Sequence, residues 1–134
     1  MKERLYINKN IEVKKSPLHG YGVFAKEKIE KDELIEECFF IVQPFSNPYN
    51  ADYLFRWPQI GDFKCNVLVL GFGGIYNSSE TLDECNAYWQ TDETNNIFIF
   101  KSKKIIEKNE EILTYYGEKW WNHHNQKYLP KNIE

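Results

Sequence analysis

Short apolar segments separated by turn residues are the feature that most constrains how this chain folds. They are alternating or continuous apolar runs, and they lie at residues 4–13, 23–25, 34–44, 67–70, 86–90 and 96–100, with a further short strand expected within 105–113. Runs of this kind, bounded by glycine, proline or asparagine, are typical of β-strands. Only residues 118–129 favour a helix, apart from a short helical piece expected around 51–57. The pattern predicts a mostly β domain whose strands are joined by long irregular connections.

The length of 134 residues leaves room for one domain. The chain has no apolar run of the roughly 18–20 residues that a transmembrane helix needs, and its first residues lack the apolar stretch of a secretory signal peptide. We therefore expect no membrane span and a location inside a cell, in the cytoplasm or nucleus of the source or of a host. The cysteines, Cys38, Cys65 and Cys85, are widely spaced without a C-x-x-C pair, which predicts neither a disulfide framework nor a metal site.

The balance of charge limits the classes of partner. Lysine and arginine number 17 against 20 for aspartate and glutamate, which gives a net charge of −3. A chain of this kind lacks the overall positive charge of a duplex-DNA-binding protein, and we expect no direct nucleic-acid partner. An acidic surface instead suits a basic partner such as a lysine-rich peptide.

One motif points to a different class of protein. Residues 20–25, Gly-Tyr-Gly-Val-Phe-Ala, satisfy the G-x-G-x-x-[GA] fingerprint of dinucleotide-binding enzymes. That fingerprint needs a strand before the glycines and a helix that starts on them, so that the pyrophosphate meets a helix N-terminus. Here Pro17 interrupts the approach, Val23 and Phe24 favour extended structure, and no further β-α-β alternation follows. The sequence therefore disfavours an oxidoreductase that binds NAD(P).

Three further segments, taken in order, form a recognisable pattern. The first is SPLHGYGVFA at 16–25 with IEKDELIEE at 29–37, the second is GFGGIYNSS at 71–79 with a Cys-Asn pair at 85–86, and the third is IIEKNEEILTYYG at 105–117. In this order they resemble the SET-domain family of lysine methyltransferases: the first is similar to its opening G-x-G turn, V-F-A and G-[DE]-x-I-x-E, the second to its motif N-H-S-x-x-P-N, and the third to its closing motif G-E-E-L-x-Y-x-Y-G. Residues 52–57, DYLFRW, also resemble the compact stand-alone members of bacteria and viruses.

The resemblance implies a fold and a chemistry. The fold is the SET (β-clip) arrangement, a mostly β structure of small curled sheets with a C-terminal pseudoknot, in which the C-terminal segment is tucked under a loop, and a short C-terminal helix. A single SET domain would span residues 1–134, with a core at about 11–121 and a tail, 122–134, that closes the site. S-adenosylmethionine (SAM) would be the methyl donor, and a lysine side chain of a protein, for example a histone, would be the acceptor.

The resemblance also implies roles for individual residues. Tyr116 is carried over as the catalytic residue, whose hydroxyl orients the amine and contacts the methyl group. Lysine must be neutral to attack, and because its free pKa is about 10.4, a water-poor aromatic channel that disfavours the ammonium form suits the reaction. Glycines in the first motif would let the backbone approach the donor closely. The sequence leaves open which of two adjacent tryptophans stacks on the adenine. The residues assigned to donor binding are His19, Gly20, Tyr21, Gly22, Tyr76, Asn77, Ser78, Trp120 and Trp121, and those assigned to the lysine channel are Tyr53, Phe72 and Thr114.

Several positions depart from the family pattern. Ser78 stands where the family usually has histidine, and Thr114 replaces an aromatic residue expected in the lysine channel. Residues 80–84 are an insertion, and Lys31 and Asn109 occupy glycine positions that we expect to be turns. These departures keep a second hypothesis open, a non-catalytic SET module that binds a lysine-containing peptide or partner. A homodimer that completes the substrate groove is a further expectation, drawn by analogy with small relatives.

Overall fold

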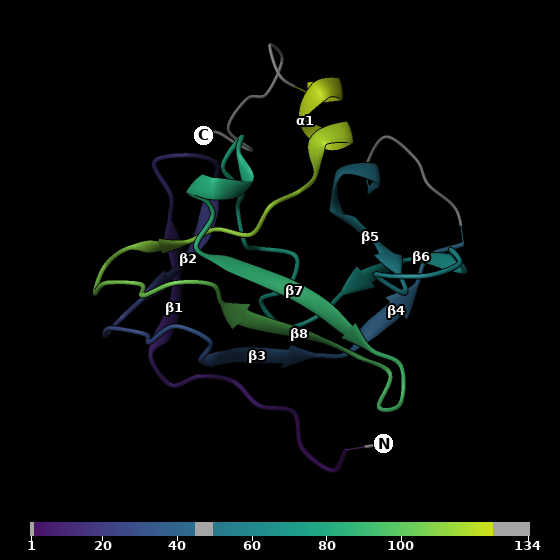
Figure 1. Cartoon of the computed structure of the whole chain (residues 1–134), viewed down its shortest axis with the longest axis horizontal. Helices are drawn as coiled ribbons and strands as arrows, with labels where there is room; N and C mark the ends of the chain where they lie inside the picture. Colours follow the sequence, from purple (N-terminus) through teal and green to yellow (C-terminus); the bar gives the residue numbers. More distant parts are fainter. Residues whose placement is uncertain (1, 45–49, 125–134) are drawn as a thin grey trace.

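Three small antiparallel sheets make up the body of the molecule, with a short helix at one end (Figure 1). The structure is a computed structural model and describes residues 2–44 and 50–124. The sheets have the strand orders β1-β2-β9, β3-β8-β7 and β4-β6-β5. The described elements are β1 (Ile11–Lys15), β2 (Tyr21–Ala25), β3 (Leu34–Cys38), β4 (Phe40–Val42), the 3₁₀ turn η1 (Ala51–Tyr53), β5 (Leu54–Trp57), β6 (Cys65–Val69), the 3₁₀ turn η2 (Leu82–Glu84), β7 (Ala87–Asp92), β8 (Ile97–Ser102), β9 (Glu111–Ile112) and the helix α1 (Glu118–His124). The predicted mostly β arrangement of small sheets is confirmed.

Aromatic side chains on the central hairpin fill the middle of the core. The hairpin predicted from two apolar runs is confirmed as β7 and β8, which pair in register around a turn. On β8, Phe98 and Phe100 are fully buried. Phe98 contacts the ring of Trp57 at 5.5 Å between centroids, and Phe100 stacks on Tyr76 at 4.6 Å. The aromatic residues therefore join the second and third sheets and the segment that carries the second motif.

The single buried strand predicted at 34–44 is wrong, because the segment is divided between two sheets. Residues 34–38 form β3, which pairs with β8, whereas residues 40–42 form β4, which pairs with β6. Phe39 lies between them with an exposed side chain, and Ile41 and Val42 are half exposed because β4 is an edge strand. A continuous apolar run does not indicate where a chain leaves one sheet for another.

Three other predicted elements are shorter than expected. Within residues 4–13, only the part from Ile11 is a strand, and Ile7 forms an isolated bridge with Glu36. The helical piece expected at 51–57 is the 3₁₀ turn η1 followed by strand β5. Helix α1 covers the start of the predicted range 118–129, and the remainder of that range lies outside the described residues.

The third motif passes between two parts of the chain that precede it, which is the pseudoknot implied by the resemblance. On one side, the Thr114 N–H donates to the Asn77 carbonyl at 2.9 Å. On the other, the Leu113 carbonyl accepts from the N–H groups of Asn86 and Ala87 at 3.1 and 3.0 Å. Both contacts are parallel bridges. The loop between the two contacts therefore encloses the segment that leads to the predicted catalytic tyrosine.

Two turns of the same design precede β3 and β9. Residues 29–33 read IEKDE and residues 106–110 read IEKNE, and in each the second glutamate accepts a hydrogen bond from the backbone N–H of the first, at 2.9 and 2.8 Å. Asp32 and Asn109 adopt left-handed φ values of 63° and 71°, which these residues tolerate better than most. The expected turns are confirmed, although the left-handed residue in the first is Asp32 rather than Lys31.

All three cysteines are free. Among residues 2–44 and 50–124, no helix is long and apolar enough to cross a membrane. In the same part of the chain, no group of His, Cys, Asp and Glu side chains is arranged to hold a metal ion.

Candidate functional site

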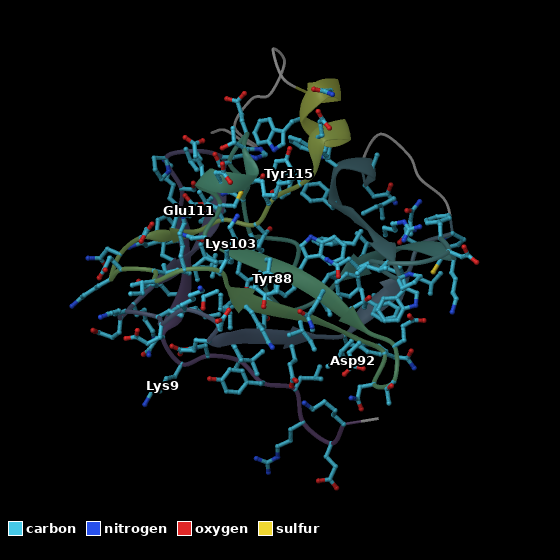
Figure 2. The ribbon with its side chains drawn as sticks, viewed as in Figure 1. Lys9, Tyr88, Asp92, Lys103, Glu111 and Tyr115 are labelled. Atoms are coloured by element: carbon cyan, nitrogen blue, oxygen red, sulfur yellow. The ribbon has the colours of Figure 1, made fainter. Side chains whose placement is uncertain are left out.

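The three sequence motifs meet at the carboxylate of Glu111 in β9. Its Oε1 accepts a hydrogen bond from Ser16 Oγ at 2.8 Å, and its Oε2 accepts one from Asn77 Nδ2 at 2.8 Å. Ser16 comes from the first motif, Asn77 from the second and Glu111 from the third. Figure 2 labels Glu111, which lies in β9, and Tyr115, which follows β9 in the chain and lies near the start of α1. The sequence did not single out Glu111, because its partners are distant in the chain.

Asn77 is held with its amide nitrogen and oxygen in fixed places. The side chain is completely buried, and Nδ2 donates to the carbonyls of His19 and Tyr21 at 3.0 and 3.1 Å as well as to Glu111. Its Oδ1 has no hydrogen-bond partner among the described residues. A buried polar oxygen without a partner is rare because it loses hydration without compensation. Asn77 Oδ1 is therefore an acceptor whose capacity the described residues leave unused.

The glycines of the first motif accommodate the chain's own packing. Gly20 has a φ of 53°, a left-handed conformation that glycine adopts without strain. A Cβ added to Gly22 would overlap the Glu111 carboxylate and lie 3.0 Å from Asn77 Nδ2. In the structure Gly22 makes room for Glu111, and the close approach of a donor to these glycines stays a prediction.

Tyr116 is fixed by hydrogen bonds at both its backbone and its hydroxyl. The hydroxyl donates to the carbonyl of Tyr76 at 2.7 Å, and the backbone N–H donates to Ser78 Oγ at 3.1 Å. Its ring contacts Trp120 edge-to-face, with the centroids 4.7 Å apart. The second motif therefore fixes the position of the predicted catalytic residue at two points.

The Ser78 hydroxyl links the second motif to the third motif and to helix α1. Its Oγ accepts from the Tyr116 N–H and from Trp121 Nε1 at 3.0 Å, and it donates to the Ser79 carbonyl at 2.7 Å. A hydroxyl has one donor and two acceptor sites, so Ser78 uses its full capacity. This serine, which departs from the family pattern, holds the start of the helix against the site.

A buried carboxyl, Glu36, orders the segment before Asn77. Its Oε1 accepts from the Tyr76 hydroxyl at 2.6 Å and its Oε2 from the Phe72 N–H at 2.9 Å. Burial raises the pKa of Glu36, although the hydrogen bonds from Tyr76 and Phe72 act in the opposite direction. Burial also raises the pKa of Tyr76. Tyr76, which the sequence assigned to donor binding, thus turns its hydroxyl into the core and offers its carbonyl to Tyr116.

A cavity of about 750 Å³ lies beside Ser78. Two of the predicted donor-binding residues line it, and the remaining wall comes from residues that the sequence did not assign. The lining residues are Leu18, Ser78, Ser79, Glu80, Asp83, Glu84, Lys104, Leu113 and Trp121. Between the two tryptophans left open by the sequence, Trp121 is the one that borders this space.

The insertion at 80–84 forms the acidic wall of the cavity. It contains η2, and Ser79 Oγ donates to Glu84 Oε1 at 2.7 Å. Hydrogen bonds from Ser79 and Thr81 lower the pKa of Glu84, which keeps it ionised. Lys104 Nζ is turned to the Asp83 carbonyl at 3.0 Å. Among the lining residues, the carboxylates of Glu80, Asp83 and Glu84 outnumber the one lysine, Lys104, which favours a ligand that carries positive charge. In the sequence, the acidic residues at 80–84 were the signal that could have predicted this wall.

The residues assigned to the lysine channel are not gathered at this cavity. Tyr53 lies in η1 with a side chain that is 40% exposed, Phe72 is half buried, and Thr114 is buried in the pseudoknot. Of the residues of the first motif, His19 and Tyr21 contribute carbonyl groups rather than side chains to the Asn77 contacts. Hydrogen bonds therefore link Ser78, which follows Asn77 in the chain, to Tyr116 and Trp121.

Comparisons with known proteins show which family the chain is similar to. The profile of the SET domain family matches residues 20–117. A protein of Schizosaccharomyces pombe (strain 972), "Histone-lysine N-methyltransferase, H3 lysine-37 specific", is 26% identical over 118 residues, which cover 86% of this chain and 78% of that protein. A crystal structure of a Plasmodium falciparum "putative histone methyltransferase" is similar with a TM-score of 0.66 and 36% identity, covering 86% of this chain and 99% of that chain.

Proposed function

Because this chain belongs to the SET-domain family of lysine methyltransferases, we propose that it transfers a methyl group from SAM to a lysine side chain of a protein. The observation that carries the proposal is the buried Asn77 Oδ1, an acceptor that no described residue satisfies. It belongs to the residue that directly precedes Ser78, a lining residue of the cavity. A ligand with a positively charged N–H donor at one end would satisfy it.

The cavity and its lining fit SAM in size and charge. Its volume of about 750 Å³ lies in the range that small ligands and cofactors occupy. Asn77 Oδ1 would accept from the α-ammonium group, Trp121 would pack against the adenine, and the acidic wall would favour the two positive charges of the ligand. When bound, SAM supplies a methyl group on a cationic sulfur. His19, Gly20 and Tyr21 would enclose its amino-acid end with backbone atoms, and Trp120 would close the site beside Tyr116.

Tyr116 is the residue that we propose to act on the lysine. Because its O–H donates to the Tyr76 carbonyl, its oxygen would act toward a bound lysine as an acceptor. An acceptor at this place would orient the lysine amine through its N–H groups and contact the methyl group through weak C–H···O interactions. Aromatic rings around it exclude water, which lowers the pKa of a bound lysine and favours the neutral amine. We propose Phe72, Thr114 and Tyr53 as the channel through which the lysine enters.

Histones are the substrate class that we propose. Both relatives described above carry histone methyltransferase in their names. The net charge of −3 suits a lysine-rich tail.

A methyl-transfer assay tests the proposal. The protein is incubated with SAM labelled on the methyl group and a mixture of histones, and the labelled side chain is identified by mass spectrometry. We expect label on lysine, a loss of about a hundredfold in rate for Tyr116→Phe, and unchanged rate for Tyr88→Phe on β7. Label on another residue type, or equal rates for both variants, would contradict the proposal. SAM binding without transfer would support the non-catalytic module instead.

A further inference from the structure

Three acceptors, one of them Glu111, fix which end of the Asn77 amide is left without a partner. An asparagine amide can be turned by half a rotation, which exchanges its nitrogen and oxygen. In this protein, the Nδ2 position is surrounded by three acceptors, the carbonyls of His19 and Tyr21 and Glu111 Oε2. Only the nitrogen satisfies acceptors there, so the amide has one orientation and Oδ1 is the atom left without a partner.

Position 111 must present acceptors at both of its side-chain oxygens. Ser16 Oγ already accepts from the N–H groups of Leu18 and His19 at 2.9 and 3.3 Å, so its own proton is what it offers to Glu111 Oε1. The other oxygen faces the Asn77 NH₂ group. A glutamine at position 111 would therefore place its NH₂ group against either the Ser16 hydroxyl or the Asn77 NH₂ group, and both of these are donors.

Gly22 supplies the space that this arrangement needs. A Cβ at position 22 would occupy the place of the Glu111 carboxylate and crowd Asn77 Nδ2. Gly22 and Glu111 lie on neighbouring strands, β2 and β9, which pair in register. The glycine, the carboxylate and the amide thus form one unit assembled from all three motifs.

We infer that Glu111 is a positioning residue that fixes Asn77 so that Oδ1 receives the α-ammonium group of the methyl donor. The inference rests on the proposed function. Through its hydrogen bond to Nδ2, Glu111 also places a negative charge one amide away from that ammonium group, which strengthens Oδ1 as an acceptor. The binding affinity of ligands that carry the amino-acid end of SAM therefore depends on Glu111, and the affinity of ligands that lack this end does not.

Calorimetric titration with three ligands tests this inference. SAM and S-adenosylhomocysteine carry the amino-acid end, whereas 5′-methylthioadenosine has the adenosine part without it. For Glu111→Gln we expect about tenfold weaker binding of the first two ligands and a change within about twofold for 5′-methylthioadenosine. The matched control is Glu12→Gln, a glutamate on β1 of the same sheet whose side chain is 41% exposed, which should leave all three affinities unchanged.

Ser16→Ala provides a second, milder test, because it removes one partner of Glu111 and leaves the contact with Asn77. It should show the same selectivity between ligands at about threefold, and it decides the question if Glu111→Gln does not fold. Equal weakening of all three ligands, or unchanged binding of SAM, would overturn the positioning role. If the wild-type protein binds none of the three ligands, the proposed function itself fails.

Discussion

Replacing Ser78 by alanine should destabilise the protein by far more than an ordinary serine substitution. The side chain is 5% exposed, and its hydroxyl accepts hydrogen bonds from the Tyr116 N–H and Trp121 Nε1. Alanine leaves both donors without that acceptor. A buried donor that loses its partner costs about 1–3 kcal/mol.

The lower part of that range applies, because Ser78 borders the cavity and water can reach part of the space left by the hydroxyl. Two donors at about 1–1.5 kcal/mol each give a loss of about 2–3 kcal/mol. At about 4 °C per kcal/mol for a chain of this size, the melting temperature should fall by about 8–12 °C.

Thermal unfolding followed by circular dichroism measures this change. The control is Ser79→Ala, because the Ser79 hydroxyl bonds to an exposed carboxylate, and it should cost no more than about 0.5 kcal/mol. Trp121→Phe removes one of the two donors, so the double variant with Ser78→Ala should reveal a coupling energy of about 1 kcal/mol. If Ser78→Ala melts within about 2 °C of Ser79→Ala, the hydroxyl does not hold the helix as described.

Two further substitutions examine the buried carboxyl of Glu36. Because burial raises its pKa above the usual 4.5, the stability that the protonated form supplies at low pH is lost as the pH rises through the folded-state pKa. The melting temperature of Glu36→Gln minus that of wild type should therefore increase from pH 4.5 to neutrality, and a constant or falling difference would contradict burial as the cause. Gly71 has a φ of 69°, and a Cβ there would lie 2.5 Å from Glu36 Oε2, whereas Gly61 has a φ of 94° and open space around it. In urea unfolding, Gly71→Ala should cost about 2–3 kcal/mol and Gly61→Ala about 1 kcal/mol; equal losses would show that the contact with Glu36 is unimportant.

Local patterns in the sequence predicted elements whose neighbours in the fold are also neighbours in the chain. The hairpin β7–β8 is the best case, because two apolar runs around a polar loop pair with each other. The division of residues 34–44 at Phe39 could not be predicted, since both halves are apolar and only their partners in different sheets distinguish them. The pseudoknot could not be predicted from the periodicity of apolar residues either, because Leu113 and Thr114 contact residues far back in the chain.

In the candidate site too, the sequence predicted some residues and could not predict those whose role depends on partners distant in the chain. The motifs led to Asn77, Ser78 and Tyr116, and the structure joins Ser78 to Tyr116 by a hydrogen bond. They did not lead to Glu111, because two adjacent glutamates before a short strand look like solvated charges until the distant partners of one are known. They also could not distinguish Trp121 from Trp120, because adjacent residues at the start of a short helix have the same local signal.

A crystal structure of the protein with SAM bound is the most direct test of where methyl transfer takes place. We expect SAM in the cavity beside Ser78 and Trp121, with its α-ammonium group within hydrogen-bond distance of Asn77 Oδ1 and its methyl group directed at the Tyr116 hydroxyl. SAM bound on another surface, or a Tyr116 hydroxyl that remains remote from the methyl group, would contradict the proposed site.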